Sequence, residues 1–181
     1  MLQHTPGNTV SNMSSTRALR DITERMGHSY SASAVGEVNV TTLMKETHAV
    51  IGGEGNGGVI YPALHYGRDA LVGVALFLTN MAKRGLKASE LRATYPDYVI
   101  SKNRKDLTPD MDVDALLKKV AALYGSKADC QVSTIDGVKI DFEDGWVHLR
   151  KSNTEPIIRI YSEAHTEARA NELAQMVMAE I

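Results

Sequence analysis

Apolar residues in the first part of the chain alternate between strand-like runs and helix-like spacings. The run 9–13 predicts a short strand, and Ser14 or Ser15 is suited to cap the helix that follows. The helix is predicted by apolar residues at helical spacing, which are Ala18, Leu19, Ile22 and Met26. It should stop at Gly27. A second strand is expected over 29–34 and a short helix over 40–45. Alternation of this kind favours helices packed on a sheet.

The next segment joins a buried strand to the longest predicted helix. The strand, 49–51, runs directly into a glycine-rich loop over 52–58. The helix begins near Asp69 and stops at Gly85. Its residues form one broad apolar face: Leu71, Val74, Ala75, Leu78 and Met81.

The order of elements changes after a break near 95–97. A strand at 98–100 precedes a helix that Asp112 caps and Gly125 ends. Three strands are then expected from alternating apolar residues: 138–142, 146–150 and 157–161. The dipeptide Asp144-Gly145 supplies a turn between the first two, and a helix from Thr166 closes the chain. Strands followed by a covering helix predict a small α+β domain.

Composition excludes several classes of protein. The 181 residues are 43% hydrophobic and 23% charged, which is ordinary for a globular chain. A formal charge of −2 argues against general nucleic-acid binding. No apolar run approaches the roughly 20 residues that span a bilayer, and the first residues resemble no targeting peptide. A single cysteine, Cys130, and scattered histidines predict neither an internal disulfide nor a metal site. We therefore expect a cytoplasmic α/β protein without membrane contact.

The glycine-rich loop is the first candidate binding site. It holds five glycines in seven residues, so its backbone can approach a ligand closely. Within it, the Glu54 carboxylate accepts hydrogen bonds from adjacent hydroxyls, and the Asn56 amide both donates and accepts. This chemistry suits a sugar, and the loop follows a buried strand, where ligands collect in α/β sheets. The alternative is a surface turn without a ligand.

The second candidate is the loop between two strands over 150–159. Arg150, Lys151 and Arg159 supply positive charge there, and hydroxyls and backbone N–H groups add donors. Such a set suits an oxyanion, most naturally a phosphate dianion. The alternative is a solvated hairpin with incidental basic residues.

Both candidates resemble loops of the α-D-phosphohexomutase family, which includes phosphoglucomutase/phosphomannomutase and phosphoglucosamine mutase. The family's phosphate loop reads Arg, any residue, Ser, Asn or Gly, Thr, any residue, Pro, and it is matched by Arg150, Ser152, Asn153, Thr154 and Pro156. The segment 53–57 is similar to the family's sugar loop, usually Gly-Glu-any-Ser-Gly-His. Here Asn56 replaces the serine, and Gly58 stands where histidine is usual.

The resemblance implies a fold and two domains. It covers nearly the whole chain but only the C-terminal half of the family's four-domain architecture. Residues 1–95 resemble the third domain, an α/β/α sheet domain that lacks its opening segment here and carries the sugar-binding loop. Residues 98–181 resemble the fourth, a small α+β domain with the phosphate loop on an antiparallel sheet covered by helices.

The resemblance also implies a reaction. A phosphoserine gives its phosphoryl group to a hexose phosphate, the bisphosphorylated sugar turns over, and the other phosphate returns to the serine. Mg²⁺ supports the transfer from an Asp-Gly-Asp-type loop. Neither that loop nor a phosphoserine loop occurs in this sequence. We therefore predict a C-terminal fragment, inactive alone, whose partners are a phosphorylated hexose and the N-terminal domains of the same enzyme.

The predicted site residues in this fragment bind substrate and perform no catalysis. Phosphate binding is assigned to Arg150, Ser152, Asn153 and Thr154, with a weaker contribution from Arg159, and sugar binding to Glu54 and Asn56. Two alternatives remain open: a stand-alone binding module for a sugar phosphate or other small anion, and a structural or interaction protein in which neither loop binds anything.

Overall fold

The computed structural model describes residues 1–108, 111–152 and 154–181, and it divides the chain into two compact units. Unit 1 is Met1–Pro96 and unit 2 is Asp97–Ile181. Each unit is built around its own five-stranded sheet. The predicted fold class, an α/β unit followed by an α+β unit, is confirmed. In the described part of the chain, no helix has the length and apolar character needed to cross a membrane.

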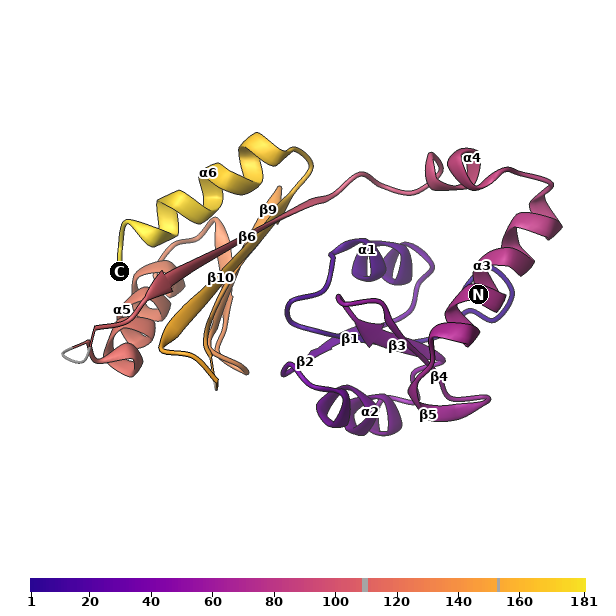
Figure 1. Ribbon diagram of the computed structural model, residues 1–181, viewed down its shortest axis with the longest axis horizontal. Helices are drawn as coiled ribbons and strands as arrows, with labels where there is room; N and C mark the ends of the chain where they lie inside the picture. Colours follow the sequence, from indigo (N-terminus) through magenta and orange to yellow (C-terminus); the bar gives the residue numbers. More distant parts are fainter. Residues whose placement is uncertain (109–110, 153) are drawn as a thin grey trace. The chain divides into compact units, whose positions relative to one another are not determined.

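Unit 1 is a mixed sheet with helices on both faces (Figure 1). Its elements are β1 (Thr9–Asn12), α1 (Ala18–Arg25), β2 (Tyr30–Ser33), α2 (Glu37–Glu46), β3 (Ile51–Glu54), β4 (Gly58–Tyr61), β5 (His65–Arg68), α3 (Ala70–Arg84) and α4 (Ala88–Arg92). The strand order is β2-β1-β3-β4-β5. β1 pairs in parallel with β2 and β3, whereas β4 is antiparallel to β3 and β5.

The alternation of side chains along β4 shows how the helices of unit 1 are layered. Ile60 is buried in a small apolar core with Val40 and Met44 of α2. The preceding residue, Val59, points to the opposite face, where its side chain packs against Gly73 of α3. α2 and α3 therefore cover opposite faces of the sheet, which gives a three-layered unit.

Two predictions for unit 1 are corrected by the structure, and one is confirmed with an unexpected exposure. The glycine-rich segment is a hairpin, because Gly52 and Gly53 are strand residues that pair with Ile60 and Val59. Neither Ser14 nor Ser15 caps α1; the Ser15 hydroxyl instead donates to Asn12 Oδ1 at 2.8 Å. The predicted helix α3 is confirmed, but none of its residues is buried.

Unit 2 is an antiparallel sheet with two helices, α5 and α6. Its elements are β6 (Val99–Asp106), α5 (Val113–Gly125), β7 (Cys130–Ser133), β8 (Val138–Phe142), β9 (Gly145–Lys151), β10 (Ile157–Ala164) and α6 (Glu167–Met178). The strand order is β6-β10-β9-β8-β7. The predicted cap Asp112 is confirmed, since it accepts a hydrogen bond from Ala115 N. The last helix begins after Thr166, as expected, and Thr166 accepts a hydrogen bond from Arg169 N.

The core of unit 2 lies between one face of its sheet and the two helices. Val147 and Leu149 of β9 pack there with Val120 of α5 and Leu173 of α6. The alternate residues of β9 therefore point to the other face of the sheet: Trp146, His148 and Arg150. This alternation places Arg150, at the end of β9, on the polar face.

Candidate functional site

The β9–β10 hairpin brings most of the predicted phosphate-binding residues together. Arg150 lies near the end of β9, and the backbone N–H of Ser152 donates to the carbonyl of Ile157 at 3.0 Å, which closes the loop. The backbone N–H of Thr154 points at Ser152 Oγ, and the two hydroxyl oxygens are 3.4 Å apart. Asn153 lies outside the described residues. The loop thus gathers two hydroxyls within four residues of Arg150 in the sequence.

Arg159 is placed on the same face of the sheet but has a carboxylate partner. It lies directly opposite Arg150 in the register of β9 and β10. Its Nη2 is 3.3 Å from Oε2 of Glu155. Two arginines at opposed positions concentrate positive charge at this end of the hairpin, and Glu155 offsets part of it.

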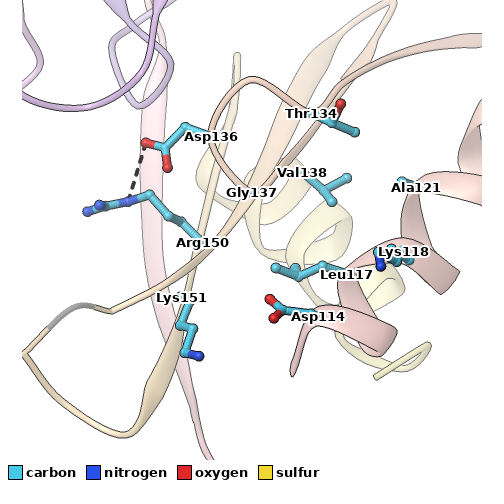
Figure 2. Close-up of a pocket in the computed structure, with 10 residues that line it drawn as sticks. All are labelled: Asp114, Leu117, Lys118, Ala121, Thr134, Asp136, Gly137, Val138, Arg150 and Lys151. Atoms are coloured by element: carbon cyan, nitrogen blue, oxygen red, sulfur yellow. Dashed lines mark ion pairs between the residues drawn. The ribbon is translucent and has the colours of Figure 1, made fainter. Parts of the chain in front are cut away.

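A second carboxylate approaches Arg150 from the connection between β7 and β8. Asp136 Oδ2 is 3.9 Å from Arg150 Nε, and both side chains are about one-fifth exposed. Figure 2 shows the Arg150 side chain extending away from Leu117, with its Nε joined to Asp136 by the ion pair. Asp136 therefore offsets part of the positive charge of Arg150.

A cavity of about 510 Å³ opens on the other side of Arg150. It is bounded by α5, the β7–β8 connection and the end of β9, with these residues (Figure 2): Asp114, Leu117, Lys118, Ala121, Thr134, Asp136, Gly137, Val138, Arg150 and Lys151. Neither Ser152 nor Thr154 borders it. Of the predicted phosphate-binding residues, the cavity is therefore bordered by Arg150 and not by the two hydroxyl residues; the adjacent Lys151 borders it as well.

His148 supports the β7–β8 connection from within unit 2. Its Nε2 lies 2.6 Å from the carbonyl oxygen of Asp136. Since a carbonyl only accepts, this nitrogen carries the proton and donates it. Burial lowers the pKa of His148 below its usual value, and the cations Lys139 and Arg150 act in the same direction. A neutral histidine thus fixes the turn that holds Asp136 beside Arg150.

Glu54 is anchored in unit 1 by residues that are far apart in sequence. Its Oε1 accepts from Asn12 Nδ2 at 3.0 Å and from the backbone N–H of Gly36 at 3.2 Å. Its Oε2 lies 3.3 Å from Arg68 Nη1, and its side chain is only 4% exposed. Asn12 and Glu54 end the parallel strands β1 and β3, so they meet at the carboxyl edge of the sheet.

Asn56 forms the tip of the β3–β4 hairpin. Its Oδ1 accepts from the backbone N–H of Gly58 at 3.2 Å, as asparagines in turns commonly do. The side chain is exposed and borders a cavity of about 500 Å³ with Glu37, Gly57, Gly58, Arg68 and Ala70. Part of its hydrogen-bonding capacity is therefore used by the turn, and its Nδ2 group remains for other partners.

Two charged residues at this cavity were not assigned a role from the sequence. Glu37 Oε2 lies 2.9 Å from Arg68 Nε, and its Oε1 accepts from the backbone N–H of Arg68 at 3.0 Å. These bonds hold the pKa of Glu37 below its ordinary value. No sequence signal pointed to Arg68, because the short strand β5 was not predicted.

The residues that the structure describes do not offer a metal site. Among them, no three His, Cys, Asp or Glu side chains are grouped closely enough to hold an ion. The Mg²⁺ that the family resemblance implies does not fit these residues. We therefore derive no chemistry of this chain through a metal.

Comparison with protein families assigns both units. The family model for phosphoglucomutase/phosphomannomutase, alpha/beta/alpha domain III, matches residues 1–98. The model for the C-terminal domain of the same family matches residues 102–180. The chain belongs to the phosphoglucomutase/phosphomannomutase family, and the resemblance drawn from its two loops is confirmed at that level.

Individual relatives show how much of a whole enzyme the chain represents. A phosphoglucomutase/phosphomannomutase of Thermococcus kodakarensis is 40% identical over 167 residues, which are 92% of this chain and 36% of that protein. A phosphoglucosamine/phosphogalactosamine mutase of Sulfurisphaera tokodaii is 40% identical over 139 residues, which are 77% of this chain and 30% of that protein. The chain thus spans about a third of the length of these relatives.

A solved structure supports the same assignment. The crystal structure of a phosphoglucomutase/phosphomannomutase family protein from Burkholderia thailandensis matches with a TM-score of 0.79 and 25% identity. The match covers 99% of this chain and 38% of that one. The folds therefore agree over almost all of the present chain.

Proposed function

We propose that this chain is the substrate-recognition half of a phosphohexomutase. The whole enzyme interconverts hexose 1-phosphate and hexose 6-phosphate through a bisphosphorylated sugar and an enzyme phosphoserine outside this chain. The observation that carries the proposal is the match of two consecutive family domains over nearly the entire chain. The chain spans only about a third of the length of its relatives, which supports the proposal that further domains complete the enzyme.

In this proposal the hairpin loop of unit 2 binds the phosphate that is not being transferred. Arg150 supplies a charge-assisted contact, and the hydroxyls of Ser152 and Thr154 donate to further phosphate oxygens. Asn153 and, more weakly, Arg159 complete the set. The loop geometry supports this role because the two hydroxyl oxygens are neighbours in the structure.

The carboxyl edge of the sheet in unit 1 binds the sugar. Glu54 is held by three donors, so its direction is fixed before a ligand arrives. Its oxygens accept from sugar hydroxyls, and Asn56 donates through Nδ2. Unit 1 thus serves the sugar and unit 2 the phosphate.

Phosphoryl transfer belongs to the N-terminal domains of the same enzyme, where the family resemblance places the phosphoserine and Mg²⁺. The chain alone should bind substrate weakly and show no turnover. Its substrate is a soluble phosphosugar, which favours a cytoplasmic location and no role for nucleic acid or membrane.

Isothermal titration of the 181-residue chain with glucose 1-phosphate tests this proposal. We expect a dissociation constant on the order of millimolar, because the remaining site residues are missing. Micromolar affinity would instead support a stand-alone binding module for sugar phosphates. Absence of any chemical-shift change at Arg150 and Ser152, in a matching NMR titration with inorganic phosphate, would overturn the phosphate assignment.

A further inference from the structure

Arg68 lies at the centre of an ion-pair network in unit 1. It is the last residue of β5 and contacts carboxylates from two other elements, Glu37 at the start of α2 and Glu54 at the end of β3. The distances are 2.9 Å from Nε to Glu37 Oε2 and 3.3 Å from Nη1 to Glu54 Oε2. The guanidinium is therefore fixed between two anchors although the side chain is nearly half exposed.

The methylene groups of Arg68 occupy the space above Gly58. A Cβ at position 58 would lie 2.5 Å from Arg68 Cδ and 2.9 Å from Cγ. Any side chain there would have to displace Arg68 from both of its carboxylates. The observed position of the Arg68 side chain therefore requires a glycine at position 58.

Arg68 retains hydrogen-bonding capacity after these contacts. Of its five side-chain N–H groups, the one at Nε donates to Glu37, and Nη1 lies 3.3 Å from Glu54 Oε2 as an ion pair. The other N–H groups have no acceptor within the described part of the chain. Arg68 also borders the cavity of about 500 Å³ that Asn56 borders. A ligand in this cavity therefore meets free guanidinium donors.

The charges around the cavity favour one kind of ligand group. Glu37 and Arg68 border the cavity, whereas Glu54 is paired with Arg68 and does not border it. Together the three side chains carry a net negative charge, which disfavours a phosphate at this place. A carboxylate acceptor beside a guanidinium donor complements neutral hydroxyls, because a hydroxyl both donates and accepts. Two neighbouring hydroxyls of a hexose ring fit this pair of side chains.

We propose that Arg68 is a specificity-determining residue of the sugar site, where its remaining guanidinium N–H groups donate to hexose hydroxyls in the cavity that it borders. Glu37 is the positioning residue that holds Arg68 in place, and Gly58 leaves the space it needs. This inference rests on the proposed function and adds the substrate group that unit 1 recognises. It assigns to the short strand β5 a role in binding.

NMR titration of the 181-residue chain with glucose 1-phosphate and its monodeoxy analogues tests this assignment. We expect Arg68→Gln to weaken glucose 1-phosphate binding about five- to tenfold, as loss of a charged hydrogen bond to a hydroxyl should. The analogue that lacks the recognised hydroxyl should then bind the variant and the unchanged chain equally well. Affinity for inorganic phosphate should stay within about twofold, since the phosphate loop is untouched.

Three further variants make the result specific to the network. Gly58→Ala should reproduce the loss without removing a charge, because it displaces the Arg68 side chain. Arg68→Lys should recover part of the affinity, whereas Glu37→Gln should lose part of it. Arg84→Gln is the matched control, because it removes the same charge from the far end of α3, where Arg84 Nη1 contacts Thr94; it should change no affinity.

The outcomes separate this inference from the proposed function. If Arg68→Gln and Gly58→Ala bind every analogue as the unchanged chain does, while phosphate still shifts Arg150 and Ser152, the assignment of Arg68 is wrong and the proposed function stands. If phosphate produces no shift at those residues, the proposed function fails first. Should Arg68→Gln lose its dispersed amide signals, Gly58→Ala alone decides.

Discussion

The Asn12 side-chain amide donates to the Glu54 carboxylate at 3.0 Å, across 42 residues of sequence. The two residues end neighbouring parallel strands, and both are largely buried. The Asn12 oxygen in turn accepts from the Ser15 hydroxyl and from the backbone N–H of Ser14. Asn12 therefore joins the end of β1, the following turn and the candidate sugar-binding carboxylate.

Asn12→Ala should destabilise unit 1 by about 2–3 kcal/mol, because it leaves buried polar groups without partners. Urea unfolding followed by the NMR signals of unit 1 measures this loss. Fluorescence of Trp146, the only tryptophan, reports unit 2 and should not change its midpoint. Asn80→Ala is the control, since its exposed amide only contacts Tyr95 at 3.4 Å. Equal stability of both variants would show that the bond between Asn12 and Glu54 is dispensable.

Arg150→Ala should weaken phosphate binding by more than about tenfold, because a charge-assisted bond to an oxyanion contributes about 1.5–3 kcal/mol. The effect should be the same for inorganic phosphate and for different phosphosugars, since the lost contact is to phosphate alone. The readout is the dissociation constant from NMR titration.

Lys151→Ala is the matched control for this prediction. It removes the same charge from the next residue, whose side chain points to the other face of the hairpin. A smaller loss, of about twofold, is expected from the change in net charge. Equal losses in the two variants would mean that the loop attracts phosphate by overall charge and not through Arg150.

The fold of unit 2 was largely predictable from the sequence because its signals are local. Alternating apolar residues and the turn at Asp144-Gly145 predicted β8 and β9. The cap Asp112 predicted where α5 begins, and the last helix was expected from Thr166, the residue before α6. Three short strands were missed, β7 in unit 2 and β4 and β5 in unit 1. In β7, apolar and polar residues alternate only weakly. β5 is four residues long, His65–Arg68, and includes a glycine and an arginine, which are not typical of strands.

The candidate site was predictable only in part because its partners are distant in sequence. The family's loop pattern pointed to Glu54, yet the groups that anchor it lie at Asn12, Gly36 and Arg68. The strand order brings these positions together, and no local pattern encodes that order. The apolar face of α3 is a similar case: the spacing of Leu71, Val74 and Leu78 predicted the helix, but all three are exposed.

His148 should make the stability of unit 2 depend on pH. Its pKa is lowered in the folded chain by burial, so the folded state binds fewer protons than the unfolded state. The contribution of neutral His148 to the unfolding free energy is fully present above the pKa of histidine in the unfolded chain, about 6.5. It is lost as the pH falls through and below that pKa. Between pH 7.5 and 5.5, the unfolding free energy from Trp146 fluorescence should fall, with a slope approaching about 1.4 kcal/mol per pH unit.

Substitution of the histidine isolates this effect. His148→Gln keeps an N–H donor for the Asp136 carbonyl but has no titrating group in this range, so its slope should be flatter. His165→Gln removes an exposed histidine of the same unit and should leave the slope unchanged. A slope that is the same in all three proteins would contradict a role for His148.

Gly137 should be intolerant of any side chain, which tests whether the turn beside Arg150 is rigid. Its φ is +71°, and a Cβ would overlap the carbonyl oxygen of Leu149. Gly137→Ala should therefore cost about 2 kcal/mol or more and should weaken phosphate binding, because the turn carries Asp136 beside Arg150. Gly125→Ala is the matched control, since nothing lies within 4 Å of its added Cβ at the end of α5. There the change should be neutral or stabilise by up to about 1 kcal/mol. If Gly137→Ala lowers stability but leaves the phosphate affinity unchanged, the turn supports the fold without positioning Arg150.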